Sequence, residues 1–439
     1  MKVLFVNTSD HAGGAAIAAL RLMSALRGAG IDVSMLCRDQ TIAQPAPGVH
    51  YLKVPAWRRL KFLLERLEIF VRNGFTRRGL FAVDTARLGN DITHHPLFHQ
   101  ADIIHLHWTN QAMLSLSDVR RILRSGKRVV VTMHDMWTFT GVCHNADSCQ
   151  RWLTGCGKCP QLMRPSTNDL SATTFRRKQK AYAAGCMTLV GCSQWMAEMA
   201  SRAPLLKGQR VVSIPNPIDT HFYAPAATEG QPTQAEVREK LGLPPYKKLI
   251  FFTAYKVTDP YKGIDHLRQA LQLLRERDAE WAKGVAVVTA GKGGEGLTEA
   301  FGSTEVYNMG LVSDPRRMRQ LYQACDILAM PTLRDNLPNT IVEAMACALP
   351  CVAYNVGGVP QMIDTGVNGY LAPLGSIESF AQGIYAVLRS PSFAALQRNA
   401  RTKAVTSYSQ EAVAREYLKI YKVLGDDASL RRDDTHNPF

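Results

Sequence analysis

The feature that most constrains the fold of this chain is its regular alternation of short apolar runs with segments of helical length. Each run is a few residues long and continuously aliphatic or aromatic, which is typical of strands that are buried on both faces. Such strands between helices form a parallel sheet that is covered on both sides. The runs are Val3–Val6, Val33–Leu36, Ile103–Leu106, Val129–Val131, Thr188–Val190, Val211–Ile214, Leu249–Thr253, Val285–Thr289, Val306–Tyr307, Ile327–Met330 and Cys351–Tyr354.

The chain has 439 residues, which are too many for one ordinary hydrophobic core, so we expect two doubly wound α/β domains. The segment 215–245 is rich in Pro, Ala, Thr and Gln and has no periodic apolar pattern, which predicts a domain boundary. We expect an N-terminal domain over 1–215 and a C-terminal domain over 216–408. A helix over about 409–424 is expected to return to the first domain, before a polar tail over 425–439.

The chain is strongly basic, with a net charge of +15 and a pI of about 9.4. This charge favours anionic partners such as nucleic acid, acidic lipid or phosphorylated small molecules. Because no RNP-like motif, zinc-finger His pair or helix-turn-helix signature is present, we expect no nucleic-acid partner. No apolar run is long enough to span a bilayer, and the N-terminus is typical of a first strand rather than a signal peptide, which predicts a cytoplasmic protein.

Two acidic residues frame a strand–loop–helix junction in the segment 331–346, PTLRDNLPNTIVEAMA. Asp335 lies in the predicted loop, and Glu343 follows in the predicted helix. Asn339 and Glu343 are four residues apart and share one helix face, while Pro338 suits the first helical position. Since a buried carboxylate is unfavourable unless something pairs with it, the junction predicts a ligand rich in hydroxyl groups.

Glycine-rich turns and two lysines lie at other predicted strand ends. Gly13 and Gly14 precede a predicted helix, whose N-terminus favours an anion. The spacing is not GxGxxG, so dinucleotide binding is not indicated. Lys256 and Lys262 follow a predicted strand and can neutralise a diphosphate leaving group, with two solvated loop lysines as the alternative. Further turns are Gly291-Lys292-Gly293-Gly294 and Gly357-Gly358-Val359-Pro360.

Three histidines lie at predicted strand ends in the first half of the chain. His105 and His107 alternate, which places both imidazoles on one face, as a metal site needs. A third ligand is not evident, so we favour a packing role over a metal site. His134 precedes Asp135 at another strand end, a position that suits substrate contact.

Four cysteines lie within the segment 143–159, CHNADSCQRWLTGCGKC. Cys156 and Cys159 form a C-x-x-C pair, whereas five residues separate Cys143 from Cys149. The cluster predicts a structural tetrahedral zinc ion, with a metal-free, thiol-rich loop as the alternative. Disulfides are not expected in a reducing compartment.

Residues 57–78, WRRLKFLLERLEIFVRNGFTRR, predict an amphipathic basic helix. Such a helix can lie on an anionic membrane, and docking on its own domain is the alternative. The apolar stripe consists of Trp57, Leu60, Leu63, Leu64, Leu67 and Phe70, and the basic residues are Arg58, Arg59, Lys61, Arg66, Arg72, Arg77 and Arg78.

Taken together, these residues resemble the GT-B glycosyltransferases of family 4, which are retaining enzymes that use nucleotide sugars. The strongest match is the pattern PT-x-RDNLPNTIVEAMACALPCVAYNVGGVP, and the resemblance extends back to the first strand. It implies two Rossmann-like domains that face a central cleft. The N-terminal domain would hold the acceptor, and the C-terminal domain would hold the nucleotide sugar.

The resemblance also implies roles for individual residues. Glu343 would hydrogen-bond the ribose of the nucleotide, and Lys262 would bind the diphosphate. Asp335 would contact the donor sugar, with the backbone of Asn336 and Leu337 beside it.

In the first half, Gly14 matches the glycine loop near the diphosphate, and His134 matches a family histidine that contacts the donor sugar. The chain departs from the family pattern at two positions. Lys256 stands where Arg is usual, which removes the bidentate fork, and Asp335 stands where Glu is usual. The second departure puts the identity of the donor sugar in question.

The implied reaction is glycosyl transfer with retention, from a UDP- or GDP-sugar to a glycan or lipid-linked glycan in bacterial surface polysaccharide synthesis. No residue stands out as a double-displacement nucleophile. The resemblance implies front-face attack, in which the leaving phosphate assists proton removal. The lysines would replace a metal, and no catalytic cofactor is expected. The alternatives are a GT-B epimerase or phosphorylase and a non-catalytic, anion-binding assembly protein. The basic helix fits a peripheral position on the inner face of the plasma membrane.

Overall fold

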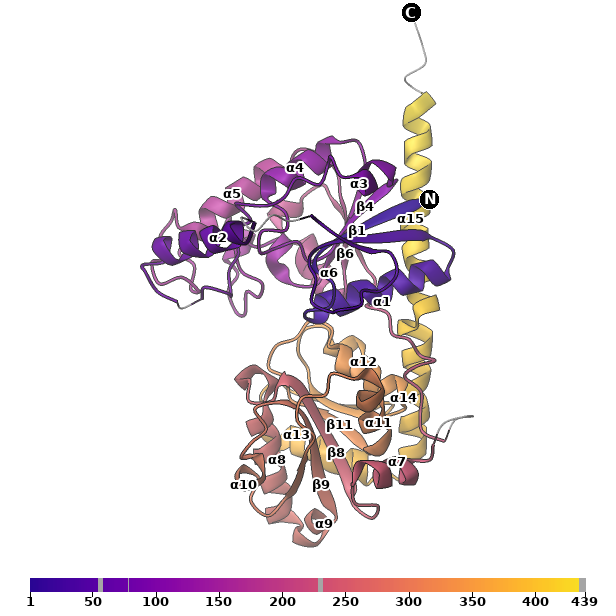
Figure 1. Ribbon diagram of the computed structural model, residues 1–439. Coiled ribbons are helices and arrows are strands. Elements are labelled where there is room, and N and C mark those ends of the chain that lie inside the picture. The colour runs from indigo at the N-terminus through magenta and orange to yellow at the C-terminus, as the bar shows by residue number, and fades with distance from the viewer. Residues whose placement is uncertain (54–57, 78, 228–231, 434–439) are drawn as a thin grey trace, which may run out of the picture. The chain divides into compact units, whose positions relative to one another are not determined.

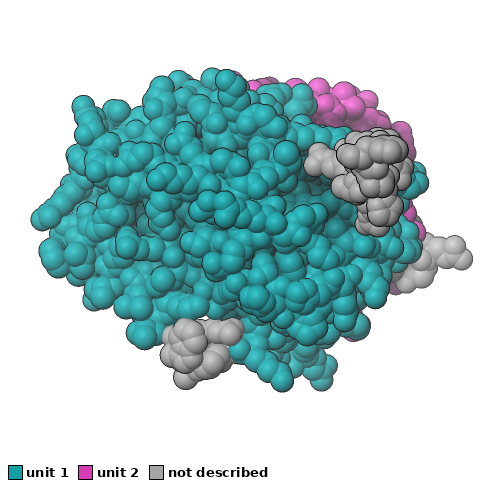
Figure 2. Space-filling view, turned by 90° about the horizontal axis from the view of Figure 1, so that it is seen from above, with its two compact units in different colours: residues 1–217, 413–439 teal, residues 218–412 magenta. Residues whose placement is uncertain are grey.

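The computed structural model describes residues 1–53, 58–77, 79–227 and 232–433. The chain divides into two compact units, which Figure 2 colours separately. Unit 1 comprises Met1–Pro217 and Val413–Phe439, and unit 2 comprises Ile218–Ala412. Trp57 and Arg78 of the predicted basic helix lie outside the described residues, as do the side chains of Arg58 and Arg59.

Unit 1 contains a seven-stranded sheet whose recorded strand pairs are all parallel (Figure 1). The order β3-β2-β1-β4-β5-β6-β7 is that of a doubly wound Rossmann-like sheet, with its switch point between β1 and β4. The strands are β1 Lys2–Ser9, β2 Asp32–Asp39, β3 Val49–Tyr51, β4 Ile103–Leu106, β5 Arg128–Met133, β6 Thr188–Gly191 and β7 Arg210–Ser213.

Unit 2 repeats this winding in a six-stranded parallel sheet. Its order is β10-β9-β8-β11-β12-β13, with the switch point between β8 and β11. The expected α/β fold with two doubly wound parallel sheets is therefore confirmed. The strands are β8 Lys248–Lys256, β9 Val285–Lys292, β10 Glu305–Asn308, β11 Ile327–Met330, β12 Cys351–Tyr354 and β13 Gly369–Ala372.

Helices connect the strands in both units (Figure 1). Those of unit 1 are α1 Gly14–Gly28, α2 Arg58–Arg72, α3 Pro96–Gln100, α4 Leu116–Arg124, α5 Leu170–Tyr182 and α6 Gln194–Ser201, and α15 Gln410–Asp433 joins them from the C-terminal end. Those of unit 2 are α7 Gln234–Leu241, α8 Ile264–Arg277, α9 Ala279–Lys283, α10 Leu297–Ala300, α11 Pro315–Ala324, α12 Asn339–Ala346, α13 Ile377–Leu388 and α14 Phe393–Tyr408. Among the described helices, none combines the length and the apolar character that crossing a lipid bilayer requires.

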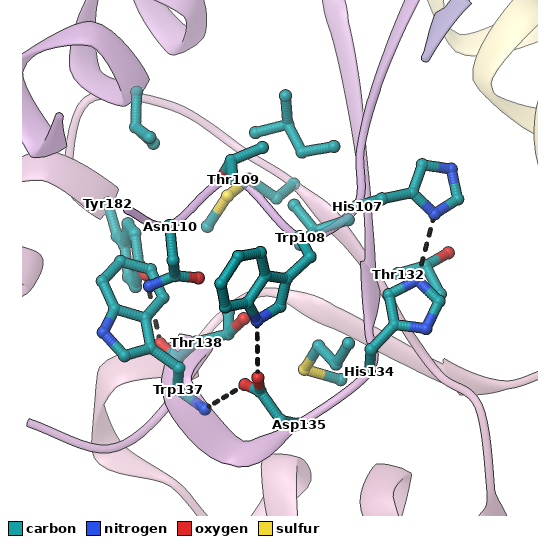
Figure 3. Close-up of a pocket in the computed structure, with 15 residues that line it drawn as sticks. His107, Trp108, Thr109, Asn110, Thr132, His134, Asp135, Trp137, Thr138 and Tyr182 are labelled. Atoms are coloured by element: carbon teal, nitrogen blue, oxygen red, sulfur yellow. Dashed lines mark hydrogen bonds between the residues drawn. The ribbon is translucent and has the colours of Figure 1, made fainter. Parts of the chain in front are cut away.

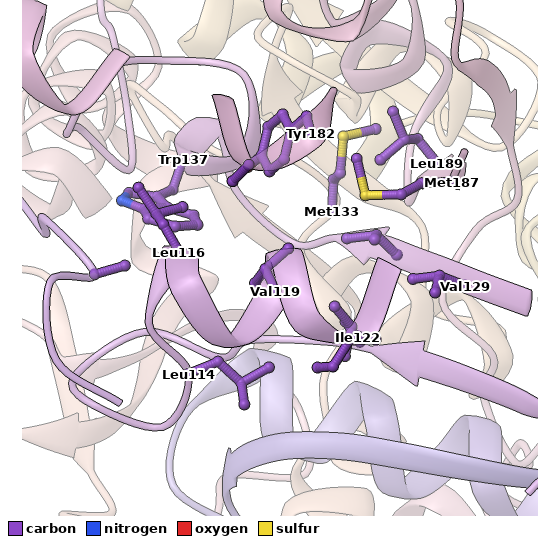
Figure 4. Packing of buried hydrophobic residues seen from close by; sticks show 14 of the residues in the cluster. Leu114, Leu116, Val119, Ile122, Val129, Met133, Trp137, Tyr182, Met187 and Leu189 are labelled. Atoms are coloured by element: carbon purple, nitrogen blue, oxygen red, sulfur yellow. The ribbon is translucent and has the colours of Figure 1, made fainter. Parts of the chain in front are cut away.

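Alternate residues of each strand pack on opposite faces of the sheet. In β1, Val3 and Phe5 pack in a cluster with α1 and α15, whereas Leu4 and Val6 pack in the cluster that contains α4 and α5. Figure 4 shows part of this second cluster, in which α4 lies against β5. Because both faces are covered, each strand must be apolar along its whole length, which explains the continuous runs in the sequence.

The last helix, α15, is held against the sheet of unit 1 by buried polar contacts. The Tyr421 hydroxyl lies 2.7 Å from Nδ1 of His105, and the Tyr417 hydroxyl lies 2.9 Å from Oγ1 of Thr132. The helix continues past Gly425 to Asp433, so it ends later than the expected position near residue 424. A single glycine inside a helix costs only about 1 kcal/mol, which does not end it.

Candidate functional site

Three loops of unit 2 meet where strands β8, β11 and β12 end. Two glycines with positive φ allow their close approach. An added Cβ at Gly263 would lie 2.1 Å from the Pro331 carbonyl oxygen, and one at Gly357 would lie 1.9 Å from that of Asp335. The amide of Gly358 donates to the Asn336 carbonyl at 2.7 Å. These contacts place the loop that carries Asp335 between its two neighbours, beside the switch point of the sheet.

An ion pair occupies the centre of this loop cluster. Nζ of Lys262 lies 2.8 Å from Oδ2 of Asp335, and their side chains are 31% and 18% exposed. Both charged groups therefore remain reachable from solvent while they neutralise each other. The ammonium can bind an anion, and the carboxylate can accept hydrogen bonds from hydroxyl groups. A ligand that carries both an anionic group and hydroxyl groups can therefore replace the contact between Lys262 and Asp335.

Further cations lie near the ends of the same strands. Lys256 is exposed at the end of β8 and is paired in register with Lys292 at the end of β9. Nζ of Lys292 lies 3.0 Å from the Tyr255 hydroxyl, and the guanidinium of Arg334 lies 3.2 Å from the ring centroid of Tyr261. Lys292 and Arg334 were not among the site residues expected from the sequence. Lys292 could have been found from the register of the parallel sheet, because its strand ends beside Lys256.

Glu343 is buried on α12, with 8% of its surface exposed. Its Oε2 accepts a 2.9 Å hydrogen bond from the hydroxyl of Tyr322 on α11. Burial and the Glu343 carboxylate together raise the pKa of Tyr322 well above its usual value, so Tyr322 remains a donor. Asn339, the first residue of α12, is partly exposed one turn from Glu343, as expected from the spacing.

The start of α12 is suited to an anion. Pro338 at its N-cap provides no side-chain cap, and its first turn contains no acidic residue. Leu337 is buried, and the backbone amide of Asn336 donates to Oδ1 of Asp335 at 3.0 Å. A helix of eight residues with an uncapped N-terminus presents amide groups to this part of unit 2.

The remaining predicted site residues belong to unit 1. Gly13 has a φ of 86° and is the N-cap of α1, and Gly14 is the first residue of that helix. Both are exposed, and no atom lies within 4 Å of a Cβ built at Gly13. Ligand atoms can therefore approach this backbone, which follows β1 at the switch point of the sheet.

His134 lies at the end of β5 and lines a small cavity (Figure 3). Its Nε2 is 3.1 Å from Nδ1 of His107. The next residue, Asp135, accepts hydrogen bonds from the Trp108 indole at 2.9 Å and from the Trp137 amide at 2.8 Å. The cavity is about 30 Å³, which is enough for water but not for a sugar. A substrate contact of His134 would therefore involve the rim of this cavity.

The histidines form a neutral stack, in which His105 and His107 are buried and His134 is half-buried. The rings of His105 and His107 are 4.4 Å apart, and those of His107 and His134 are 5.4 Å apart. Burial lowers the pKa of His105 to about 3 and that of His134 to about 4, and it lowers the pKa of His107 well below the usual value. Asp135 and His144 are both favoured in their charged forms. Burial disfavours the charge on each group, but their mutual contact lowers the pKa of Asp135 and raises that of His144.

This stack predicts acid sensitivity. The folded protein keeps these histidines neutral, whereas the unfolded chain binds protons as the pH falls below 6.5. The stability that they contribute is complete above about pH 6.5 and is lost as the pH falls toward 4. Each histidine should add about 1.4 kcal/mol per pH unit to the slope of the free energy of unfolding. In urea denaturation over this range, His105→Gln should reduce the slope, and His94→Gln, whose side chain is 86% exposed, should not.

The four clustered cysteines line one further cavity of unit 1, together with Trp152. All four are free thiols, and burial raises the pKa of Cys143 to about 12 and that of Cys156 to about 11. Within the described ranges, no three side chains of His, Cys, Asp or Glu are arranged to hold a metal ion. Because all four thiols line one cavity, they could contact the same ligand. Their positions do not form a metal site, so structural zinc stays a prediction.

Comparisons with known proteins agree with this geometry. A family model described as Glycosyltransferase Family 4 matches residues 12–222, and one described as Glycosyl transferases group 1 matches residues 246–390. D-inositol 3-phosphate glycosyltransferase of Rhodococcus jostii is 29% identical over 234 residues, which cover 51% of this chain and 50% of that protein. The protein of the same name from Salinispora arenicola is 31% identical over 172 residues, 37% of this chain and 38% of its own. The chain spans about half the length of the curated relatives it matches.

Solved structures match over nearly the whole chain. Sucrose-phosphate synthase of Thermosynechococcus elongatus has a TM-score of 0.66 at 17% identity and covers 97% of this chain and 99% of its own. Anabaena HepE, solved in complex with UDP-glucose, has a TM-score of 0.62 at 16% identity, with 96% and 100% covered. At these identities the likeness concerns the fold. Since the family models match a long segment in each unit and both sheets share the doubly wound order, the chain belongs to the glycosyltransferases of family 4 and has their GT-B fold.

Proposed function

We propose that this protein transfers a sugar from a nucleotide-sugar donor to a glycan or lipid-linked glycan, with retention at the anomeric carbon. The observation that carries the proposal is the accessible Lys262–Asp335 ion pair, which lies beside the uncapped start of α12 in the helix that bears Glu343. This grouping offers a cation for a diphosphate and carboxylates for sugar hydroxyl groups. A nucleotide sugar contains both.

In the proposed reaction, Lys262 and Lys256 stabilise the negative charge that builds on the leaving diphosphate. Glu343 accepts hydrogen bonds from the ribose, and Asp335 contacts the donor sugar beside the amides of Asn336 and Leu337. The acceptor oxygen bonds to the anomeric carbon while the bond from that carbon to the diphosphate oxygen breaks. The acceptor proton passes to the departing phosphate, because the acceptor attacks the same face of the sugar from which the phosphate leaves.

Unit 1 would supply the acceptor side. The same unit would also contribute to donor binding: Gly13 and Gly14 expose backbone at the start of α1 for the diphosphate, and His134 presents a neutral imidazole, which can donate or accept a hydrogen bond with the donor sugar. We favour a bacterial surface glycan as the acceptor. An inositol phosphate is a second candidate, because the relatives from Rhodococcus and Salinispora are named for it.

The donor base is the first quantity to measure. Calorimetric titration with UDP, GDP, ADP and dTDP should show tight binding of one nucleotide, and UDP is the first choice because HepE was solved with UDP-glucose. Release of that nucleotide from its sugar should then require an acceptor, and the product should keep the anomeric configuration of the donor.

Other outcomes of these assays would contradict the proposal. Isomerised nucleotide sugar without acceptor would indicate an epimerase, and turnover that depends on phosphate would indicate a phosphorylase. Binding without turnover of any donor and acceptor pair would indicate a non-catalytic assembly protein.

The zinc prediction has its own test. If the cluster binds zinc, protein purified without chelators should contain about one zinc per chain by elemental analysis. Cys156→Ser with Cys159→Ser should lose the metal, and Cys186→Ser, an exposed cysteine of the same unit, should retain it. A metal-free wild-type protein would reject the prediction.

A further inference from the structure

Helix α2 presents its aliphatic face to solvent. Leu60, Leu63, Leu64, Leu67 and Val71 are between 41% and 58% exposed. Among residues 60–72 of this helix, the only other exposed side chain is that of Arg72. Single exposed leucines are common, but four leucines and a valine on one surface helix form a continuous apolar strip, and such strips mark interaction sites.

Two charged residues of the same helix face the protein. Glu65 and Arg66 are 1% and 6% exposed. Arg66 donates to the carbonyl oxygen of Leu80 at 2.6 Å and to Oδ2 of Asp84 at 3.0 Å. Oε1 of Glu65 accepts from the Thr85 hydroxyl at 2.9 Å. The buried side of α2 therefore combines this polar network with Ile69, which is fully buried in an apolar cluster, while the aliphatic strip faces solvent. An amphipathic surface helix usually buries its main apolar stripe instead.

These buried contacts keep the leucines outside. A rotation that buried the strip would break the contacts of Arg66 and Glu65. Burial and the nearby Asp84 raise the pKa of Glu65 to about 7, which shows how unfavourable a second carboxylate is there. Since buried ion networks rarely add stability over apolar packing, this network acts chiefly to fix the orientation of α2.

Apolar and basic side chains continue past the C-terminal end of α2. Phe75 is 64% exposed, and Met163, whose amide donates to Oδ1 of Asn73 at 2.7 Å, is 48% exposed. Arg77 and Arg164 are exposed in the same segments. The acidic Glu68 is only 15% exposed and is shared by Arg72 at 3.6 Å and Arg87 at 2.7 Å, so the charge on the rim is positive.

We propose that the strip formed by Leu60, Leu63, Leu64, Leu67 and Val71 inserts into an anionic membrane surface, with the surrounding arginines on the lipid headgroups. An interfacial helix needs this combination of aliphatic side chains and basic residues. A second copy of the chain is a poorer occupant, because pairing two such strips would bring their positive rims together. The docking is independent of the proposed chemistry, so a Lys262→Ala protein should bind membranes as the wild type does.

Flotation of the full chain with vesicles tests this proposal. Binding to vesicles of phosphatidylcholine with phosphatidylglycerol should exceed binding to phosphatidylcholine alone and should weaken in high salt. Leu63→Gln with Leu67→Gln should reduce binding on the order of 10- to 100-fold. Leu374→Gln with Val367→Gln, which alters residues of similar exposure in unit 2, should leave binding unchanged.

Three results would overturn the proposal. One is absence of wild-type binding to either vesicle, and another is equal binding of the wild type and the Leu63/Leu67 variant. The third comes from sedimentation velocity: a wild-type dimer that the same variant converts to monomer would identify a second copy as the occupant. Circular dichroism of both double variants should match the wild type, because the exchanged side chains are exposed.

Discussion

Lys262→Ala should lower kcat/KM for nucleotide-sugar transfer by about a thousand-fold, equivalent to about 4 kcal/mol of transition-state stabilisation. Charge builds on the diphosphate as the glycosidic bond breaks, and no metal is proposed to neutralise it. The ammonium of Lys262 is held beside Asp335 by the loop contact at Gly263, so it is already oriented for the leaving group. The loss should appear mainly in kcat, measured as initial rates of nucleotide release.

The same variant should keep its stability. The Lys262–Asp335 pair is partly solvated, with 31% and 18% exposure, and such pairs contribute less than about 1 kcal/mol. Lys403→Ala is the matched control, because Lys403 forms a 2.6 Å ion pair with Asp364 in unit 2 with a side chain that is 23% exposed. Lys256→Ala should have a smaller effect on kcat than Lys262→Ala, since Lys256 is more exposed. Equal activity of Lys262→Ala and Lys403→Ala would reject the proposed role.

The central strands could be predicted from sequence because each is buried on both faces and must be continuously apolar. Two strands that were not expected from the sequence, β3 and β13, are edge strands of their sheets, whereas the other two edge strands, β7 and β10, were expected. An edge strand pairs with one neighbour only and needs less apolar surface. In β13, Gly369 lies so close to the Cys351 carbonyl oxygen that a Cβ would approach it to 2.1 Å, so close packing selects a residue that is a poor strand former.

The candidate site was predictable where charged residues follow strand ends, as at Asp335 and Lys262, which form an ion pair in the structure. What sequence could not supply is which loops contact each other. The glycines at 263 and 357 appeared as turns, but their importance lies in the carbonyl groups of Pro331 and Asp335 opposite them. Partners far apart in the chain are hidden in the same way: Tyr421 lies 316 residues from His105, with which it hydrogen-bonds.

The orientation of α2 illustrates a second limit. Its periodicity predicts an apolar stripe with a basic surround. The leucines of the stripe share one face, but Arg66 of the expected surround is buried. Periodicity alone implies that the stripe is the buried side, because it usually is. The opposite result depends on Asp84 and Thr85, which bind Arg66 and Glu65 from a loop about twenty residues away in sequence. Lys61 also faces inward, toward Asn90, so it is not part of the basic rim.

Glu343→Gln should weaken nucleotide binding by about a hundred-fold, as expected when a carboxylate that accepts hydrogen bonds from hydroxyl groups loses its charge. Glutamine keeps the shape of the side chain, and its oxygen can still accept from the hydroxyl of Tyr322. The fold should therefore remain intact. Glu343→Ala is less informative, because an unpaired buried Tyr322 hydroxyl would cost about 1–3 kcal/mol of stability.

Deoxynucleotides make this test specific for the ribose. Wild-type protein should bind the ribonucleoside diphosphate more tightly than its 2′- or 3′-deoxy analogue, and Glu343→Gln should lose most of this discrimination. Tyr322→Phe is the control, because it removes the hydrogen bond to Glu343 at 2.9 Å but leaves the carboxylate, so it should retain the preference for ribose. If Glu343→Gln binds all of these nucleotides with wild-type affinity, Glu343 is a buried structural acid and the nucleotide lies elsewhere in unit 2.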